Sequence, residues 1–328
     1  MARGGSFFAT SLRSELVARS HAHARGRLHV RSYGNPPVIV FAPEESRHGN
    51  FLDATFAAIA ARPEWARRFE KIHAQGRSLP RAERKWRELD SSMSSDALLM
   101  NVFCAPGVME SSAVRRMLGV DSDDAPLFGW KARVPLANGL VDRTEVDMRW
   151  GNLLVEAKLT EGDFQTCKSG RVEAYRAFDA IFDRDLLPRV PIAVERRKVP
   201  AEFPEEYSQE EEYVAPEVWQ RTLYEPSRAS VAGYASYQLI RNVLAAYAQS
   251  ADFCVLHDAR RPDLREAWFD VMAAVRAAEM RVRLKVLTWQ ELAEVLPPEV
   301  ADFLDRKYGI VAPGKVASPI GAVTGFDR

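Results

Sequence analysis

The 328-residue sequence lacks the patterns that mark several common classes of protein. Its three cysteines, Cys104, Cys167 and Cys254, are scattered and include no CxxC pair, so neither a zinc finger nor a disulfide scaffold is expected. No apolar run approaches the length of about 18 residues that a membrane-spanning helix needs. GxGxxG, Walker A and GxSxG patterns are missing as well, which argues against a nucleotide-driven motor and against a nucleophilic triad of that type.

The sparse cysteines are typical of a reducing compartment, and we predict a cytoplasmic location. Residues 1–30 are rich in Arg, Ser and Ala and contain one acid, Glu15, which is also the composition of a transit peptide. Arg- and Ala-rich bacterial chains share this composition, so both interpretations stay open.

The chain has no net charge, but its charges are unevenly distributed. Residues 1–90 contain 16 Lys and Arg against 9 Asp and Glu. A local basic face is enough to bind phosphate, so zero net charge does not exclude nucleic acid as a partner. The basic segment 62–89 is either such a face or a solvated helical surface.

Hydrophobic spacing predicts an α/β fold with a central mixed sheet and helices on both faces. A helical, basic region over 1–90 precedes a core over 91–310, with an insertion at about 161–230 and a flexible tail over 311–328. We predict helices over 51–75, 95–105, 170–182, 230–248 and 262–279. We predict strands over 131–137, 143–150, 152–160, 252–257 and 282–289, with a short apolar run at 189–194.

Gly151 and Asn152 separate two alternating runs and predict a two-residue hairpin turn. Trp150 then faces Leu153, and the rest of the register follows. One face of the hairpin collects the charged residues Glu145, Asp147, Glu156 and Lys158. The other face is apolar and collects Val146, Met148, Trp150, Leu153, Val155, Ala157 and Leu159.

This register places Asp147 directly opposite Glu156, a pairing of like charges that destabilises a sheet unless something compensates. Both carboxylates could point at water from a half-exposed sheet. Strands of an α/β sheet are usually covered on both faces, however, and two carboxylates suit a hard cation such as Mg²⁺. Lys158 could then orient a nucleophile or stabilise negative charge on a phosphate.

An Asp, a hairpin and then "EAK" at 156–158 resemble the PD-(D/E)XK nuclease superfamily. Two other Asp/Glu-x-Lys triplets, at 83–85 and 305–307, lie in charged helical contexts without an acid across a turn. The family's Pro before the Asp is replaced by Val146. The flanks at 48–51, 94–101 and 158–164 are similar to a group of restriction endonucleases within the superfamily.

The resemblance implies further site residues on the helix predicted at 230–248. Tyr234, Tyr237, Gln238 and Arg241 fall on one polar stripe of that helix, which is either a surface stripe or an approach to the active site. In the family a Gln or Tyr of this helix approaches the site, so Gln238 fits a catalytic role and Tyr237 and Arg241 could contact phosphate. A carboxylate on the first core helix occurs in some relatives, and Glu110 and Asn101 are candidates without a geometric argument.

The resemblance implies a Mg²⁺-dependent DNA endonuclease of restriction or defence type, with Mn²⁺ as a substitute metal. Catalytic residues would be Glu145, Asp147, Glu156, Lys158 and Gln238, and the metal ligands Asp147 and Glu156. The alternative is a protein that binds nucleic acid on a degenerate nuclease core without cleaving it. RNA or a branched junction also stays open as the substrate. Double-strand cleavage usually needs two active sites, which favours a homodimer.

Overall fold

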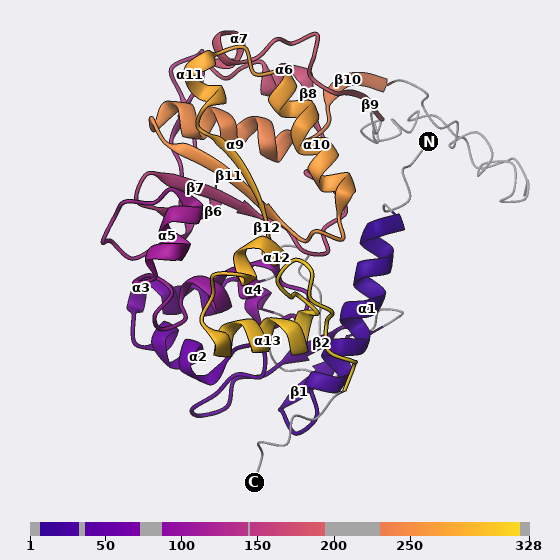
Figure 1. Cartoon of the computed structure of the whole chain (residues 1–328). Helices are drawn as coiled ribbons and strands as arrows, with labels where there is room; N and C mark the ends of the chain where they lie inside the picture. The colour runs from indigo at the N-terminus through magenta and orange to yellow at the C-terminus, as the bar shows by residue number, and fades with distance from the viewer. Residues whose placement is uncertain (1–6, 33–36, 73–86, 144, 194–229, 322–328) are drawn as a thin grey trace, which may run out of the picture.

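The computed structural model describes residues 7–32, 37–72, 87–143, 145–193 and 230–321 (Figure 1). The elements before the central sheet are α1 (Phe7–His23), β1 (His29–Arg31), β2 (Ile39–Phe41), α2 (Asp53–Ala60), α3 (Pro63–Ala66), η1 (Arg67–Glu70), η2 (Glu88–Asp90), α4 (Ser95–Phe103) and α5 (Ser112–Leu118). The next are β3 (Leu127–Lys131), β4 (Val134–Pro135), β5 (Val141–Asp142), β6 (Glu145–Trp150), β7 (Leu153–Ala157), β8 (Cys167–Lys168), α6 (Ser169–Val172), α7 (Phe178–Ile181) and β9 (Arg189–Ala193). The last are β10 (Ser230–Tyr234), α9 (Tyr237–Ala248), β11 (Asp252–His257), α10 (Pro262–Ala273), α11 (Ala278–Arg281), β12 (Leu284–Thr288), α12 (Trp289–Ala293) and α13 (Pro298–Tyr308).

The centre of the fold is a mixed five-stranded sheet in the order β12-β11-β7-β6-β3. β7, β11 and β12 run parallel, whereas β6 is antiparallel to both β7 and β3. This is the predicted fold class. The first strand of the sheet was placed too late in the sequence. β3 ends at Lys131, which pairs with Glu145, whereas Val134–Pro135 belongs to a separate two-stranded sheet.

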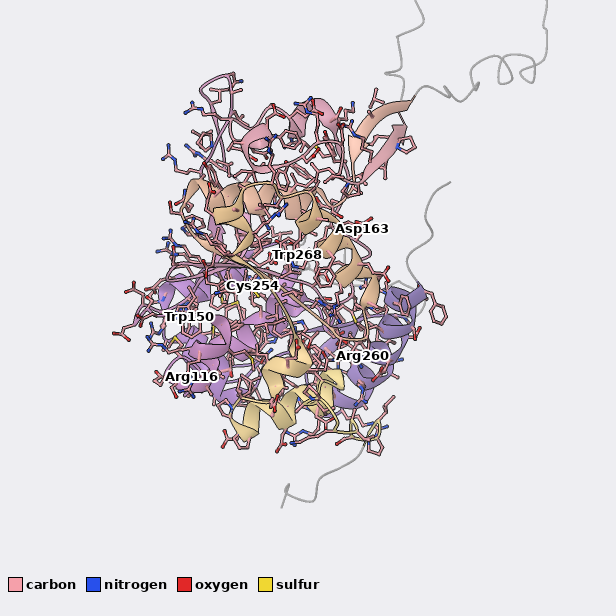
Figure 2. The ribbon with its side chains drawn as sticks, turned by 45° about the horizontal axis from the view of Figure 1, so that its top comes forward. Arg116, Trp150, Asp163, Cys254, Arg260 and Trp268 are labelled. Atoms are coloured by element: carbon pink, nitrogen blue, oxygen red, sulfur yellow. The ribbon has the colours of Figure 1, made fainter. Side chains whose placement is uncertain are left out.

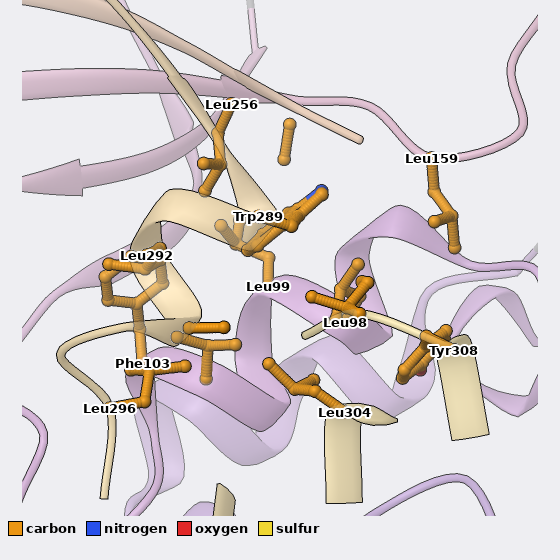
Figure 3. Close-up of a cluster of buried hydrophobic side chains, with 14 of the residues drawn as sticks. Leu98, Leu99, Phe103, Leu159, Leu256, Trp289, Leu292, Leu296, Leu304 and Tyr308 are labelled. Atoms are coloured by element: carbon orange, nitrogen blue, oxygen red, sulfur yellow. The ribbon is translucent and has the colours of Figure 1, made fainter. Parts of the chain in front are cut away.

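Hydrophobic side chains cover both faces of the sheet. On one face, α4, α12 and α13 pack against the apolar side of the hairpin, and Figure 3 shows Leu98, Leu99 and Phe103 meeting Trp289, Leu292 and Leu304 there. On the other face, α9 and α10 cover Leu154, Phe253 and Val255. Figure 2 shows Trp268 on this side. Between these helices Glu156 and Lys158 are buried, whereas Glu145 and Asp147 are half-buried.

One residue of the predicted apolar hairpin face belongs to the other core. Val146 packs with Leu154 in the cluster under α9, whereas Met148 and Trp150 pack under α4. The regular ladder is interrupted between them, because the side chain of Asp147 accepts a hydrogen bond from the backbone of Ala157 at 2.8 Å. Simple alternation therefore holds only on the turn side of Asp147.

The N-terminal region packs against the rest of the fold. α1 lies along α13, and Arg19 on α1 donates hydrogen bonds to the carbonyl oxygens of Asp305 and Ser318. Trp65 is buried, and with Phe51 and Ile59 it packs against α4. The predicted helix over 51–75 is divided into α2, α3 and η1, and β1 pairs with β2. In the part of the chain that the structure describes, no helix is long and apolar enough to cross a bilayer.

The predicted helix over 170–182 is replaced by two short helices, α6 and α7. Between them, the chain turns to the edge strand β4: Ala137 donates a backbone hydrogen bond to Ala174, and Arg176 donates one to Pro135. Tyr175 is buried and its hydroxyl contacts Asp142. These tertiary bonds compete with helical ones and interrupt the helix.

The predicted helix over 230–248 begins at Tyr237, seven residues late. Ser230–Tyr234 forms β10, which pairs with β9 and β8 in a three-stranded sheet. Gly233 lies so close to Ile192 that a Cβ atom would be 2.3 Å from its Cδ1. Pairing with a strand distant in sequence and the close approach at Gly233 therefore make this segment a strand. Ser236, at a φ of 57°, then turns the chain into α9. Most of the predicted insertion, residues 194–229, lies outside the described residues.

Candidate active site

The charged residues of the hairpin line a cavity of about 490 Å³ beside α9. Its lining side chains come from the N-terminal region, α4, the hairpin, the loop after it and α9: Lys71, Glu88, Ser95, Asp96, Glu145, Asp147, Glu156, Lys158, Glu161, Asp163, Gln165, Gln238 and Arg241. Seven of them are acidic and three are basic. The cavity therefore has a surplus of negative charge that attracts cations.

The predicted hairpin register is confirmed next to the turn, but the ladder ends before the predicted pairings of Asp147 with Glu156 and of Glu145 with Lys158. Trp150 pairs with Leu153, and Met148 pairs with Val155. Gly151 adopts a φ of 56°, which suits the first central position of a II′ turn. A Cβ there would also lie 2.6 Å from the Cβ of Ser122, so the turn requires glycine on two grounds.

Asp147 is held at the point where β6 and β7 separate. Its Oδ2 accepts the hydrogen bond from Ala157, and Oδ1 accepts none from the residues that the structure describes. Burial, followed by the negative charges of Glu156 and Asp96, holds the pKa of Asp147 well above its usual range. One oxygen of Asp147 is therefore available to a ligand, and a bound cation would favour its charged form.

Glu156 is almost fully buried, and both of its carboxylate oxygens have partners. Lys158 Nζ donates to Oε1 at 2.7 Å, and Asn242 Nδ2 on α9 donates to Oε2 at 2.7 Å. Charge-assisted hydrogen bonds of this length are among the stronger ones in proteins. They fix the orientation of the carboxylate beside Asp147.

Lys158 is anchored through its backbone at the end of β7. Its N–H donates to the carbonyl of Leu256 at 2.8 Å, and its carbonyl accepts from Trp289 Nε1 at 3.1 Å. Burial alone would lower the pKa of its ammonium group, but Glu156, Glu161 and Asp147 outweigh burial and raise the pKa above the ordinary value. Lys158 is therefore a cation and no proton acceptor.

The loop after Lys158 is held by Arg261, a fully buried residue that the sequence analysis did not identify. Its guanidinium donates to the carbonyl oxygens of Leu159, Glu161 and Gly162, at 3.3, 2.8 and 3.3 Å. Asp263 neutralises it at 2.9 Å. This clamp places Glu161 at the cavity wall.

The helix after the insertion lies across the sheet face that bears Asp147, as predicted. Gln238 lines the cavity, and its side chain forms no hydrogen bond with the described residues. Arg241 also lines the cavity and donates from Nη2 to the carbonyl of Glu145 at 3.2 Å. Both residues present polar groups to a ligand in the cavity.

Tyr237 was expected to contact phosphate, but the structure places it in the core. Only 6% of its surface is exposed, and its hydroxyl lies 3.1 Å from that of Tyr175. Tyr234, on the same predicted stripe, lies on β10 instead of the helix. Because the helix starts three residues after Tyr234, the stripe reduces to Gln238 and Arg241.

Asp96 is a carboxylate on α4 that the sequence analysis did not identify. It lies in the first turn of α4, two residues after the N-cap Ser94, and it lines the cavity. An acid in the first turn is common for electrostatic reasons alone, so the sequence provides no distinguishing signal. Neither of the two candidates lines this cavity: Glu110 lines a different one, and Asn101 is buried with its amide bonded to backbone groups.

Asn242 was also missed, although a signal existed. It lies four residues after Gln238, one helical turn further, among the apolar residues Leu239 and Val243. A polar residue on the core-facing side of a helix requires a buried partner. Here that partner is Glu156.

The mixed sheet flanked by helices, with carboxylates and a lysine gathered beside its central hairpin, defines a restriction-endonuclease-like α/β protein. A family model described as Restriction Endonuclease associating with ARP matches residues 14–309. The chain therefore belongs to this restriction-endonuclease family. No curated protein and no solved structure matches the sequence.

Proposed function

We propose that the protein is a Mg²⁺-dependent DNA endonuclease of the PD-(D/E)XK type, acting in restriction or defence. The observation that carries the proposal is the convergence of Asp147, Glu156 and Lys158 on one cavity that also holds Gln238. Asp147, the hairpin and the Glu156-Ala157-Lys158 triplet stand in the order that this superfamily uses. Family membership supports the nuclease assignment.

The donor set fits a hard divalent cation. Carboxylate oxygens of Asp147 and Glu156 would hold Mg²⁺, which commonly takes one or two protein carboxylates and completes its shell with water and phosphate. Among the described residues, no group of three or more His, Cys, Asp or Glu side chains forms a metal site by itself. When bound, Mg²⁺ would neutralise phosphate charge and make a water molecule more acidic.

The protein's own side chains divide the remaining work. Lys158 remains protonated beside Glu156 and can donate a hydrogen bond to a nonbridging phosphate oxygen, where negative charge grows during hydrolysis. The unpaired amide of Gln238 can orient the attacking water or a phosphate oxygen. Arg241 can contact a neighbouring phosphate of the same strand.

A cleavage assay on supercoiled plasmid tests the proposal. The wild-type protein should nick or linearise plasmid with Mg²⁺ or Mn²⁺ and leave it intact with EDTA. Lys158→Ala should remove cleavage, whereas Lys315→Ala, which removes an exposed lysine in the C-terminal segment, is the matched control and should cleave normally. Because positioned electrostatic groups contribute about 10²–10³ in rate, the loss should exceed tenfold.

Two results would contradict the assignment. Cleavage that persists in EDTA, or in Lys158→Ala at the wild-type rate, would exclude this mechanism. DNA binding without cleavage in any metal would instead support a binding protein on a degenerate nuclease core. Running linear duplex, single-stranded DNA, branched DNA and RNA in parallel would define the substrate, and sedimentation with and without DNA would test a homodimer.

A further inference from the structure

Two cations from the N-terminal region enter the proposed active site. Arg68 lies on η1 and is 9% exposed, and its Nη1 lies 3.1 Å from Glu145 Oε1. Its Nη2 contacts the carboxylate of Asp96. Lys71 follows the same short helix and lies 2.8 Å from Glu145 Oε1 and 3.7 Å from Asp96 Oδ2. Lys71 also lies 2.8 Å from Glu88, so the two cations are shared by three carboxylates, and both Asp96 and Glu145 have a cation from the protein itself.

The fold makes room for this arrangement at Gly129, in the middle of β3. Gly129 adopts a φ of 60°, and a Cβ atom there would overlap the guanidinium of Arg68. Its neighbours in the strand, Phe128 and Trp130, pair with Met148 and Val146 on either side of Asp147. The side chain of Arg68 therefore crosses β3 at Gly129, the position in the strand that lies next to Asp147 of β6.

Four of the seven acidic residues that line the cavity consequently fall into two groups. Glu145 and Asp96 share the cations of Arg68 and Lys71. Asp147 forms no ion pair with any cation of the described chain, and Glu156 pairs with Lys158 through one oxygen. A divalent ion beside Asp96 would lie next to a buried guanidinium of like charge, where repulsion is poorly screened.

We propose that Arg68 and Lys71 occupy the place that a second cation would take, so that each chain binds one divalent ion, at Asp147 and Glu156. This inference rests on the proposed nuclease function, because it concerns the metal of that site. Arg68 and Lys71 are positioning residues that hold Asp96 and Glu145 away from the metal. The N-terminal region is then a structural part of the active site.

Counting bound Mn²⁺ ions on the full chain without DNA tests the inference, by electron paramagnetic resonance of free Mn²⁺. The wild-type protein should bind one ion, Asp147→Asn should bind none, and Asp96→Asn should still bind one. Arg68→Met should bind a second ion, because Asp96 and Glu145 lose their main cation. Arg67→Met is the matched control and should bind one, since Arg67 is exposed and forms no ion pair with the described residues.

Circular dichroism would show whether Arg68→Met folds, and Lys71→Met, at a half-buried position, provides a second variant. A further ion should bind to it more weakly than to Arg68→Met, because Arg68 still contacts Asp96 and Glu145. Two ions on the wild-type chain, with one lost in Asp96→Asn, would overturn the inference. One ion on folded Arg68→Met and folded Lys71→Met would overturn it as well. A chain that binds one ion at Asp147 but cleaves no nucleic acid would refute the nuclease proposal and support this one, so the two failures differ.

Discussion

Asn242 helps to fix the orientation of Glu156, and replacing it should weaken metal binding while the protein still folds. Asn242 is fully buried, and its Nδ2 donates a hydrogen bond of 2.7 Å to Glu156 Oε2. Its Oδ1 is buried and has no partner among the described residues. Asn242→Leu has a similar volume and removes both the useful donor and the unpaired acceptor.

The two losses act on stability in opposite directions. A hydrogen bond to a charged group contributes about 1.5–3 kcal/mol, and a buried unpaired polar atom costs about 1–3 kcal/mol. These two contributions largely offset each other, but Asn242→Leu also leaves the buried Oε2 of Glu156 unpaired, so the free energy of unfolding should fall by about 1–3 kcal/mol. Metal affinity should fall as well, because removing the hydrogen-bond partner of a metal ligand, the role proposed here for Glu156, typically costs about 10–100-fold.

Asn242→Asp provides the contrasting variant, because it places a second carboxylate against Glu156. A buried charge without compensation costs about 3–5 kcal/mol, so this variant should unfold at clearly lower urea concentration. Urea unfolding and Mn²⁺ titration of both variants measure the two effects separately. A wild-type Mn²⁺ affinity in folded Asn242→Leu would refute the reasoning, because it would show that Glu156 needs no partner on α9.

Three further predictions concern pH, catalysis and the hairpin turn. Burial lowers the pKa of His23 to about 2, so the folded state resists protonation. The stability present above the unfolded pKa of about 6.5 should fall on acidification to pH 4.5 by about 2.7 kcal/mol, and this contribution to the slope should be absent from urea titrations of His23→Gln. An unchanged slope would contradict the assignment. Gln238→Ala should lower the rate of single-turnover cleavage by about 10²–10³. Melting temperature and DNA affinity should stay nearly constant, because the side chain has no hydrogen-bond partner in the described fold. Cleavage at the wild-type rate would show that Gln238 is only a surface residue. Gly151→Ala should destabilise the protein by roughly 2–4 kcal/mol, because of its positive φ and the contact with Ser122. Gly107→Ala, at a φ of 83° with open space around it, should lose only about 1–2 kcal/mol. Equal losses in thermal unfolding would contradict the steric argument.

The hairpin could be predicted in detail because its determinants are local. Period-two alternation, a glycine able to adopt positive φ and the register that follows from a two-residue turn all lie within residues 143–160. The N-cap at Ser94 is equally local, since its side chain accepts a hydrogen bond from the backbone of Ala97 at 3.1 Å. Strands β11 and β12 were predictable because their buried runs are short and bounded by polar residues.

The predictions that were wrong concern element boundaries and residue partners that depend on contacts between distant segments. Ser230–Tyr234 has an apolar pattern compatible with a helix, but β9 and β8 provide backbone partners that make it a strand. Tyr237 occupies the helical position expected of it, yet the buried hydroxyl of Tyr175 determines its environment. Secondary-structure propensity is weak beside such long-range bonds and packing.

By itself the sequence determined that Asp147, Glu156 and Lys158 share a hairpin face, because strand geometry places alternating residues of paired strands together. Only the tertiary structure decided what surrounds them. Arg68 reaches the site from 77 residues away from Glu145, and Asn242 reaches Glu156 across 86 residues. Such contacts exist only after the sheet is covered by α9 and the N-terminal region, since burial is what brings these charges within reach and makes each unpaired one costly.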